Sequence, residues 1–387
     1  MGQQKRVRLA ITARDQEEAD RIRFVVHSNG FSLADTFTSP RHTYHVASRS
    51  QYDIFITCQN FHDMSGLTLI QSLRGTGNYG LESHLVLVDS LDRELMVVLA
   101  ECNIRYVIQK PFNSEHISQK LESLWKEECH LPPAEIAYRE AHAAFHSGLS
   151  EMAMNLAAKF IKDNKPNEKF LLLLGDIFFK LEKHEEAGKV YQKAREAFPY
   201  SYVPAHKIAR LLMQQQRYDE AVLLLDDLAR LSPLNLEILA NTGLANFEIG
   251  QYEKSKAAML KLKQLDRERK DANQILARIA IREGNYESSF RILVDSHSAI
   301  ELCEILHREA EAMRKQNSYV RVIDFYIKHI EMMNDHPFLF DLYYRLGLAY
   351  QDIFDQIQAK RNLEKALGLE PSYEPAATAL LQLTTKN

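Results

Sequence analysis

The sequence predicts two fold classes in succession: a doubly wound α/β domain with a parallel five-stranded sheet, followed by an all-α helical solenoid. Two observations support this prediction. In the first 130 residues, short apolar runs alternate with amphipathic helical stretches. Beyond them, related phrases recur every 34 residues, as in RYDEA, QYEKS and NYESS around Tyr218, Tyr252 and Tyr286.

The N-terminal region predicts five strands and several helices. Because strand and helix candidates alternate, we expect a parallel sheet with helices on both faces. Loops that follow neighbouring strands converge at the carboxyl edge of such a sheet, so a functional site is expected there. The strand candidates are 7–11, 31–37, 53–57, 84–88 and 105–108, and the helix candidates are 15–28, 66–74, 91–102 and 114–127.

The 34-residue period predicts helical hairpins, about seven of them over residues 131–387, with a capping helix over 375–384. A hairpin needs a turn-permissive residue between its helices and a small residue where they cross closely. The turn positions are Gly148, Glu182, Gln216, Gly250 and Gly284, and the small residues are Ala153, Ala187, Ala221, Ser255 and Ser289.

Two segments of the solenoid resemble the tetratricopeptide repeat (TPR) signature. The first carries Leu174, Gly175, Phe178, Ala187, Tyr191, Ala194 and Pro199, and the second carries Leu346, Gly347, Tyr350, Ala359, Leu363, Ala366 and Pro371 at the same offsets. Other units depart from it: Arg267 stands where Pro199 and Pro233 stand in earlier units, and 303–339 is out of phase. The resemblance implies a scaffold that binds a protein or peptide.

The first 130 residues resemble the receiver domain of bacterial response regulators. The resemblance is carried by DIFITCQNFHDMSGLTLIQSLR at 53–74 and YVIQKPF at 106–112. It implies a flavodoxin-like fold. In that family an Asp after the third strand accepts a phosphoryl group, an acidic pair after the first strand holds magnesium, a Thr or Ser follows the fourth strand, and a Lys follows the fifth.

At these positions the sequence retains only the lysine, Lys110. Cys58 stands at the acceptor position, Thr12 and Ala13 replace the acidic pair with Asp15 nearby, and Asp89 replaces the Thr or Ser. A thiol cannot form the acyl phosphate, an anionic Asp89 would repel a phosphoryl group, and one displaced carboxylate is a poor magnesium site. We therefore predict a degenerate phosphoacceptor pocket without metal in a pseudo-receiver domain over 1–130, in which Asp89 pairs with Lys110.

The first helix of each hairpin lines the concave groove of this architecture, where a peptide or partner helix would lie. Arginine and aromatic side chains at these offsets suit a peptide with acidic and apolar residues. The receiver surface near 91–127 is a second expected partner or homodimer surface, as the resemblance implies. The predicted groove residues are His206, Arg210, Asn241, Phe247, Gln274, Arg278 and Arg282.

Composition excludes several other classes. Lys and Arg number 48 and Asp and Glu 52, a balance that disfavours generic nucleic-acid binding. No apolar run is long enough for a membrane span, and we expect no membrane insertion and a cytoplasmic location. The four cysteines form no CxxC pair, and the common enzyme motifs do not occur, so we predict no enzyme activity and no cofactor.

The leading interpretation is a bacterial signalling adaptor: a phosphorylation-incompetent pseudo-receiver joined to a TPR array that recruits a partner. One alternative is a true two-component (phosphorelay) response regulator with TPR output, in which Asp63 or Asp53 would accept the phosphoryl group. Another is a redox sensor that acts through Cys58, since a nearby lysine favours the thiolate.

Overall fold

The computed structural model of the chain describes residues 5–76, 79–333 and 337–385. Residues Met1–Gln251 together with Lys261–Arg267 form one compact unit, and Tyr252–Leu260 together with Glu268–Asn387 form a second. None of the helices within the described ranges has the length and apolar character needed to cross a membrane.

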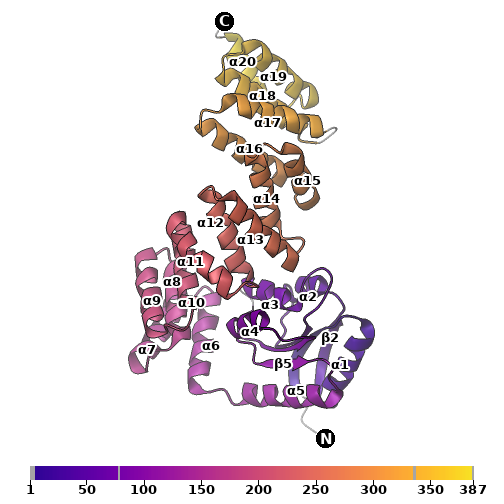
Figure 1. The fold of residues 1–387 in the computed structure, drawn as a ribbon, viewed down its shortest axis with the longest axis vertical. Coiled ribbons are helices and arrows are strands. Elements are labelled where there is room, and N and C mark those ends of the chain that lie inside the picture. The colour runs from indigo at the N-terminus through magenta and orange to yellow at the C-terminus, as the bar shows by residue number, and fades with distance from the viewer. Residues whose placement is uncertain (1–4, 77–78, 334–336, 386–387) are drawn as a thin grey trace. The chain divides into compact units, whose positions relative to one another are not determined.

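The N-terminal part of the first unit is a five-stranded parallel sheet with the strand order β2-β1-β3-β4-β5, flanked by helices (Figure 1). This is the flavodoxin-like doubly wound order, so the predicted fold class is confirmed. The sequence reading missed one helix, α2. The elements are β1 (Lys5–Thr12), α1 (Gln16–Ser28), β2 (Phe31–Phe37), α2 (Pro40–Ala47), β3 (Ile54–Cys58), α3 (Gly66–Gly75), β4 (Ser83–Val88), α4 (Arg93–Glu101), β5 (Tyr106–Gln109) and α5 (Ser114–Cys129).

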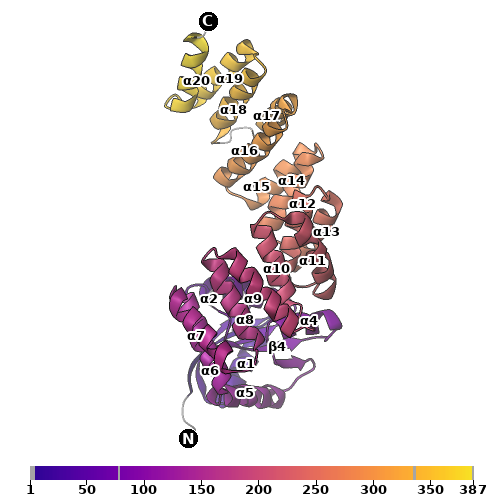
Figure 2. The ribbon, with the colours of Figure 1, turned by 90° about the vertical axis from the view of Figure 1, so that its left-hand side faces the viewer.

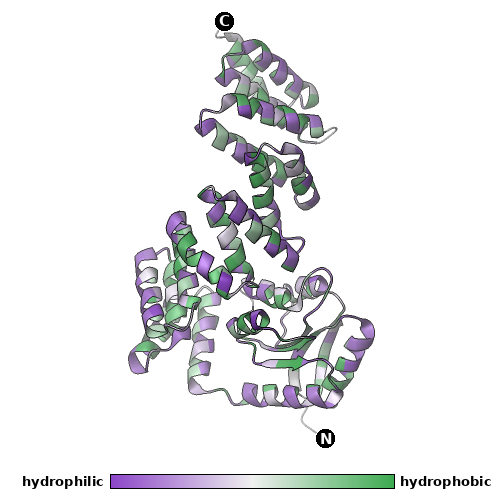
Figure 3. Ribbon diagram, viewed as in Figure 1, coloured by the Kyte–Doolittle hydropathy of each residue, from purple (hydrophilic) through white to green (hydrophobic). Residues whose placement is uncertain are grey.

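Alternation along β1 divides the core between the two faces of the sheet. Leu9 and Ile11 pack with α1 and α5, whereas Ala10 lies on the opposite face with residues of α2 and α3. The central strand β3 is buried at every residue, which explains why it reads as a continuous apolar run rather than an alternating one. Figure 3 shows hydrophobic residues along the strands and mixed hydropathy along the helices around them.

Beyond residue 132 the described chain consists of helices joined by turns and short loops. Helices that follow one another pack as pairs, as α6 does with α7 and α8 with α9 (Figure 2). The helices are α6 (Pro133–His146), α7 (Ser150–Asp163), α8 (Glu168–Lys180), α9 (His184–Ala197), α10 (Val203–Gln214), α11 (Tyr218–Leu231), α12 (Leu236–Glu248), α13 (Tyr252–Leu265), α14 (Lys270–Arg282), α15 (Tyr286–Ser296), α16 (Ala299–Lys315), α17 (Tyr319–Met332), α18 (Leu339–Asp352), α19 (Gln356–Leu369) and α20 (Glu374–Thr385).

The predicted turn positions all adopt left-handed backbone conformations. Three of them are glycines, for which a positive φ carries no steric penalty, but Glu182 and Gln216 adopt the same conformation at φ of 58° and 59°. Asn317 and Phe354 do so in the two turns near the C-terminus. The turn geometry therefore persists where the sequence no longer has glycine.

The small residues lie where two helices cross closely. A Cβ atom built on Gly175 in α8 would come within 2.2 Å of the Tyr191 ring in α9. Tyr191 is fully buried, and its hydroxyl donates to Asp176 at 2.8 Å. In the segment that is out of phase, α16 has 17 residues, against 13 in α8, so the extra residues lengthen a helix.

Candidate functional site

The carboxyl ends of the strands bring four predicted or neighbouring residues together in the receiver-like domain. Cys58 ends β3, Asp89 follows β4, Lys110 follows β5, and Arg14 follows β1. A fifth residue, Glu18, comes from the first turn of α1, where Asp15 is the N-cap. The convergence is the one expected of a parallel sheet, whose loops meet at one edge.

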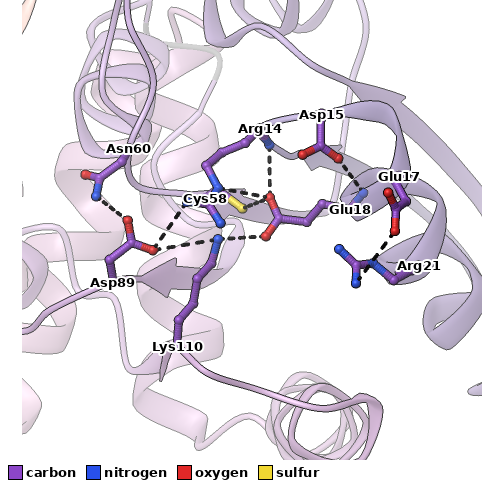
Figure 4. A network of polar contacts seen from close by, with 9 residues as sticks. All are labelled: Arg14, Asp15, Glu17, Glu18, Arg21, Cys58, Asn60, Asp89 and Lys110. Atoms are coloured by element: carbon purple, nitrogen blue, oxygen red, sulfur yellow. Dashed lines mark hydrogen bonds and ion pairs between the residues drawn. The ribbon is translucent and has the colours of Figure 1, made fainter.

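Glu18 is the centre of this cluster (Figure 4). One of its carboxylate oxygens accepts a hydrogen bond from Lys110 Nζ at 2.7 Å, and the other accepts from the Cys58 thiol at 3.3 Å and the Arg14 backbone N–H at 3.1 Å. The Glu18 side chain is 8% exposed. Burial alone would raise the pKa of Glu18, but these hydrogen bonds, the one from Lys110 above all, lower it to about 2. The carboxylate is therefore ionised at neutral pH.

Cys58 is a buried thiol beside this carboxylate. Burial, followed by the negative charge of Glu18, raises the pKa of the Cys58 thiol to about 12, against the opposing effect of Lys110. The thiolate, which is the reactive form, is accordingly scarce at neutral pH. The Lys110 ammonium group donates its hydrogen bond to the Glu18 carboxylate and does not offset the effect of burial on the Cys58 thiol.

Asp89 lies at the edge of the cluster. It accepts a hydrogen bond from Asn60 Nδ2 at 2.6 Å, and its other oxygen lies 3.7 Å from Arg14 Nη1 and 3.8 Å from Lys110 Nζ. The expected pairing of Asp89 with Lys110 therefore exists only as a long ion pair. The hydrogen-bonded counter-charge of Lys110 is Glu18, because the first turn of α1 brings that carboxylate closer to the ammonium group.

Three residues predicted for the pocket have other roles. The Thr12 hydroxyl is fully buried and bonds that of Thr43 at 3.0 Å, and Ala13 is a core residue. Asp15 accepts from the Glu18 backbone N–H at 2.8 Å, so it caps α1 instead of facing Lys110. None of the three therefore has a hydrogen bond to the side chain of Lys110 or Glu18 among the interactions described.

Sequence reasoning missed Glu18 and Arg14. A signal was available, since an acidic residue three positions after an N-cap lies in the first helical turn, over the end of the preceding strand. Among the described residues, no group of three or more His, Cys, Asp or Glu side chains is arranged to hold a metal ion.

In the first unit, the predicted groove residue Arg210 on α10 is already engaged within the chain. Its Nη2 lies 3.2 Å from Asp176 Oδ1 on α8, and its guanidinium sits 4.5 Å from the centroid of the Phe179 ring. Lys207 also donates to Asp176, at 2.8 Å. Burial alone would raise the pKa of Asp176, but the charges of Lys207 and Arg210, with hydrogen bonds from Lys207 and Tyr191, lower it. Glu237 Oε1 lies 3.8 Å from Arg210 Nη1, so two carboxylates face these two cations within the chain.

The other predicted residues of this unit differ in exposure. Phe247 is buried, with 4% of its surface exposed, so it is a core residue and was wrong as a contact. His206 is also buried, which lowers its pKa, and its Nε2 has no hydrogen-bond partner in the described part of the chain. The half-buried Asn241 on α12 likewise has an unpaired Nδ2 among the described residues.

In the second unit, the two predicted arginines share one buried carboxylate. Arg278 Nε donates to Glu309 Oε1 at 2.6 Å, and Arg282 Nη2 lies 2.9 Å from Glu309 Oε2. Glu309, on α16, is completely buried. The expectation that these arginines await an acidic peptide is therefore corrected in part, since each has an intramolecular partner. Gln274 is half-buried on the same helix, α14.

Comparison with known proteins identifies the repeats. Residues 138–202 and 206–268 match a family model described as tetratricopeptide repeat, and residues 340–373 match a second model with the same description. The chain thus combines an α/β domain of flavodoxin-like strand order with segments that match tetratricopeptide repeat models. No curated protein matches the sequence significantly.

Several solved structures are similar at low identity. Chemotaxis protein CheY4 of Vibrio cholerae is 17% identical, with 30% of this chain and 98% of that chain covered and a TM-score of 0.29. MamA from Desulfovibrio magneticus RS-1 is 20% identical, covering 48% and 97%, with a TM-score of 0.38. A tetratricopeptide repeat protein from Parabacteroides merdae is 18% identical, covering 65% and 98%, with a TM-score of 0.41.

Proposed function

We propose that this chain is a cytoplasmic signalling adaptor of bacterial type. In this proposal residues 1–130 form a pseudo-receiver that does not accept a phosphoryl group, and residues 131–387 form a TPR array that binds a protein or peptide partner. The observation that carries the proposal is the hydrogen-bonded pair of Lys110 and Glu18, 2.7 Å apart, with a thiol at the acceptor position.

The charges of the cluster support a pocket that is satisfied without ligand. Two cations, Arg14 and Lys110, face two carboxylates, Glu18 and Asp89. An incoming phosphoryl group would have to displace Glu18 from Lys110 and approach Asp89 at the same time. Both steps oppose the binding of an anion, because they expose a buried charge and bring like charges together.

The partner is proposed to lie on the first helices of the hairpins. TPR repeats are interaction modules, and the half-buried Asn241 lies on α12, a first helix of a hairpin, at one of the predicted groove positions. Since Arg210 is engaged by Asp176, the groove of the first unit favours a partner bound through its main chain over a strongly acidic one.

The alternative acceptors of a true response regulator lack such support. Asp53 precedes β3 and accepts from the Arg8 backbone N–H at 2.8 Å, so it lies at the opposite end of the strand from Cys58. Asp63 lies 3.7 Å from Arg41 and has no contact with Lys110 among the interactions described. The redox alternative gains no support either, because the Cys58 thiol is buried and its pKa is raised.

The first test is incubation of the full chain with acetyl phosphate and magnesium, followed by intact-mass measurement. We expect no phosphoryl adduct on the wild-type chain or on Cys58→Asp, because Glu18 and Arg14 still occupy the pocket. A conventional receiver domain treated in parallel shows that the reagent is active. An adduct on the wild-type chain would refute the pseudo-receiver proposal.

The second test is affinity capture with the full chain, the groove variant Asn241→Ala and a matched control. Leu223 on α11 is 73% exposed, so Leu223→Ala changes the surface outside the predicted groove. We expect a partner held by the wild-type chain and by Leu223→Ala to be lost with Asn241→Ala. Equal capture by both variants would place the working surface elsewhere.

A further inference from the structure

The receiver-like domain holds the turn between α11 and α12 within the first unit. The Gln71 carboxamide on α3 makes two hydrogen bonds to it: Nε2 donates to the Leu234 carbonyl at 3.1 Å, and Oε1 accepts from the Leu236 backbone N–H at 2.9 Å. Leu236 is the first residue of α12, and its N–H is one of the groups that a helix cannot satisfy internally. Gln71 therefore acts as a cap supplied by another domain.

Two further contacts secure this turn. Asn235, the N-cap of α12, donates to Glu101 Oε2 at the end of α4 at 2.7 Å. Leu234 packs against the apolar cluster formed by α3, α4 and the neighbouring strands, which contains Leu67 and Ile70. Polar and apolar contacts thus fall on the same short segment, residues 234–236.

The same domain holds a second segment, at the end of α13. Arg41 Nη2 on α2 donates to Asp266 Oδ1 at 2.6 Å, and Thr68 Oγ1 on α3 donates to the Leu265 carbonyl at 3.3 Å. Met64 forms an antiparallel β-bridge with Asp266. The Asp266 residue is only 5% exposed, so its charge is buried against the receiver-like domain.

The second segment coincides with a departure in the repeat sequence. The two preceding 34-residue repeats end in Pro199 and Pro233, whereas Arg267 occupies the equivalent position in this repeat. Proline stiffens the chain by fixing its own φ and restricting the residue before it. In the repeat that has Arg267 in place of proline, the preceding residue, Asp266, is instead held by contacts with Arg41 and Met64 of the receiver-like domain.

We propose that the receiver-like domain stabilises the TPR array by holding the ends of two successive 34-residue repeats, at residues 234–236 and 265–266. This function is separate from partner binding and needs no phosphoryl chemistry. It gives a physical reason for the fold to persist with an altered pocket: the stabilising contacts come from α2, α3, α4 and the loop after β3, not from Lys110 or Glu18.

The test is hydrogen exchange of the full chain with mass spectrometry, comparing wild type, Arg41→Ala and Gln71→Ala. We expect exchange in 262–267 to accelerate in Arg41→Ala by about tenfold, as for loss of a charge-assisted hydrogen bond. In Gln71→Ala the acceleration should fall in 234–240. The matched control is Arg23→Ala, which breaks an exposed pair with Asp20 of similar length, 2.7 Å, and should leave both segments unchanged.

In the same experiment, slow exchange of the backbone amides of β1 and β3 shows that the receiver-like domain of a variant is folded. If Arg41→Ala loosens that domain, Asp266→Ala probes the same contact from the repeat side. Arg41→Ala combined with Asp266→Ala should accelerate exchange no more than the stronger single variant. The proposal would be overturned if folded single variants exchanged as slowly as wild type in both segments. It would also be overturned if the accelerations of the two single variants added in full in the double variant.

Discussion

Lys110 Nζ lies 2.7 Å from Glu18 Oε1, so a carboxylate from helix α1 neutralises the lysine that follows β5. Both side chains are largely buried, at 16% and 8% exposure. Two buried charges stabilise a fold only when each keeps its partner and its hydrogen bonds. Glu18 meets this condition through the Cys58 thiol and the Arg14 backbone N–H as well as Lys110.

Removing one member of this pair is expected to destabilise the receiver-like domain. Glu18→Gln leaves the Lys110 ammonium without its buried counter-charge, at a cost of about 3 kcal/mol. The measurement is the free energy of unfolding in urea. Glu17→Gln is the matched control one residue away, because Glu17 pairs with Arg21 at 4.0 Å with both side chains mostly exposed, and its loss should cost less than about 0.5 kcal/mol.

The double variant Glu18→Gln with Lys110→Met distinguishes the cost of an unpaired buried charge from the contribution of the ion pair itself. It removes both charges, so its free energy of unfolding should lie above that of Glu18→Gln alone. Equal losses for Glu17→Gln and Glu18→Gln would show that the pair contributes no more than a surface contact.

The lowered pKa of Glu18 predicts a pH dependence with a definite sign. Its folded-state pKa is about 2, below the ordinary value of 4.5, so the stabilisation is complete above pH 4.5 and is lost as the pH falls toward 2. The difference in unfolding free energy between wild type and Glu18→Gln should therefore shrink between these values. A difference that stays constant down to about pH 3 would contradict the assignment of the shift to Glu18.

Cys58 is expected to be unreactive in the folded protein. Its thiol is buried and its pKa is raised to about 12, whereas Cys129 is exposed. A thiol reagent at neutral pH should modify Cys129 first, and Cys129→Ser should remove that rapid phase while Cys58→Ser leaves it unchanged. Rapid modification of Cys58 in native protein would revive the redox-sensor alternative.

The fold was predictable because its signals are local. Continuous apolar runs mark strands buried on both faces, and β3 is such a strand. The helix α2, PRHTYHVA, escaped because it is short and polar, and its start depends on the Ser39 cap and Pro40 rather than on an apolar stripe. The 34-residue period located turns even at Glu182 and Gln216, which adopt positive φ without being glycine.

The site was predictable only in part because its decisive contacts are not local in sequence. Position after a strand placed Cys58, Asp89 and Lys110 at one edge, but Glu18 reaches that edge from a helix, 92 residues from its partner Lys110. The groove arginines show the same limit. Repeat register places Arg278 and Arg282 on one helix, yet only the packing of α14 near α16 shows that Glu309 already pairs with both.

The close crossing of α8 and α9 predicts a large effect at Gly175. A Cβ there would meet Tyr191 at 2.2 Å, so Gly175→Ala should lower the free energy of unfolding by about 1–3 kcal/mol. Gly368 in α19 is the matched control, since nothing lies within 4 Å of its Cβ position. Gly368→Ala should be neutral or stabilising by up to about 1 kcal/mol. Equal changes in stability in the two variants would show that the close crossing at Gly175 adds no penalty to the gain in helix propensity.

Glu309 should be the most sensitive carboxylate of the second unit. It is completely buried, and it bonds Arg278 at 2.6 Å and pairs with Arg282 at 2.9 Å. Glu309→Gln removes the buried charge that both guanidinium groups contact, which should cost about 3 kcal/mol of unfolding free energy. Glu331→Gln is the control, because Glu331 pairs with Lys328 at 3.1 Å on an exposed surface and its loss should cost less than about 0.5 kcal/mol. If Glu309→Gln were equally mild, the pairs with Glu309 would contribute little to stability, and an acidic partner would again suit this groove.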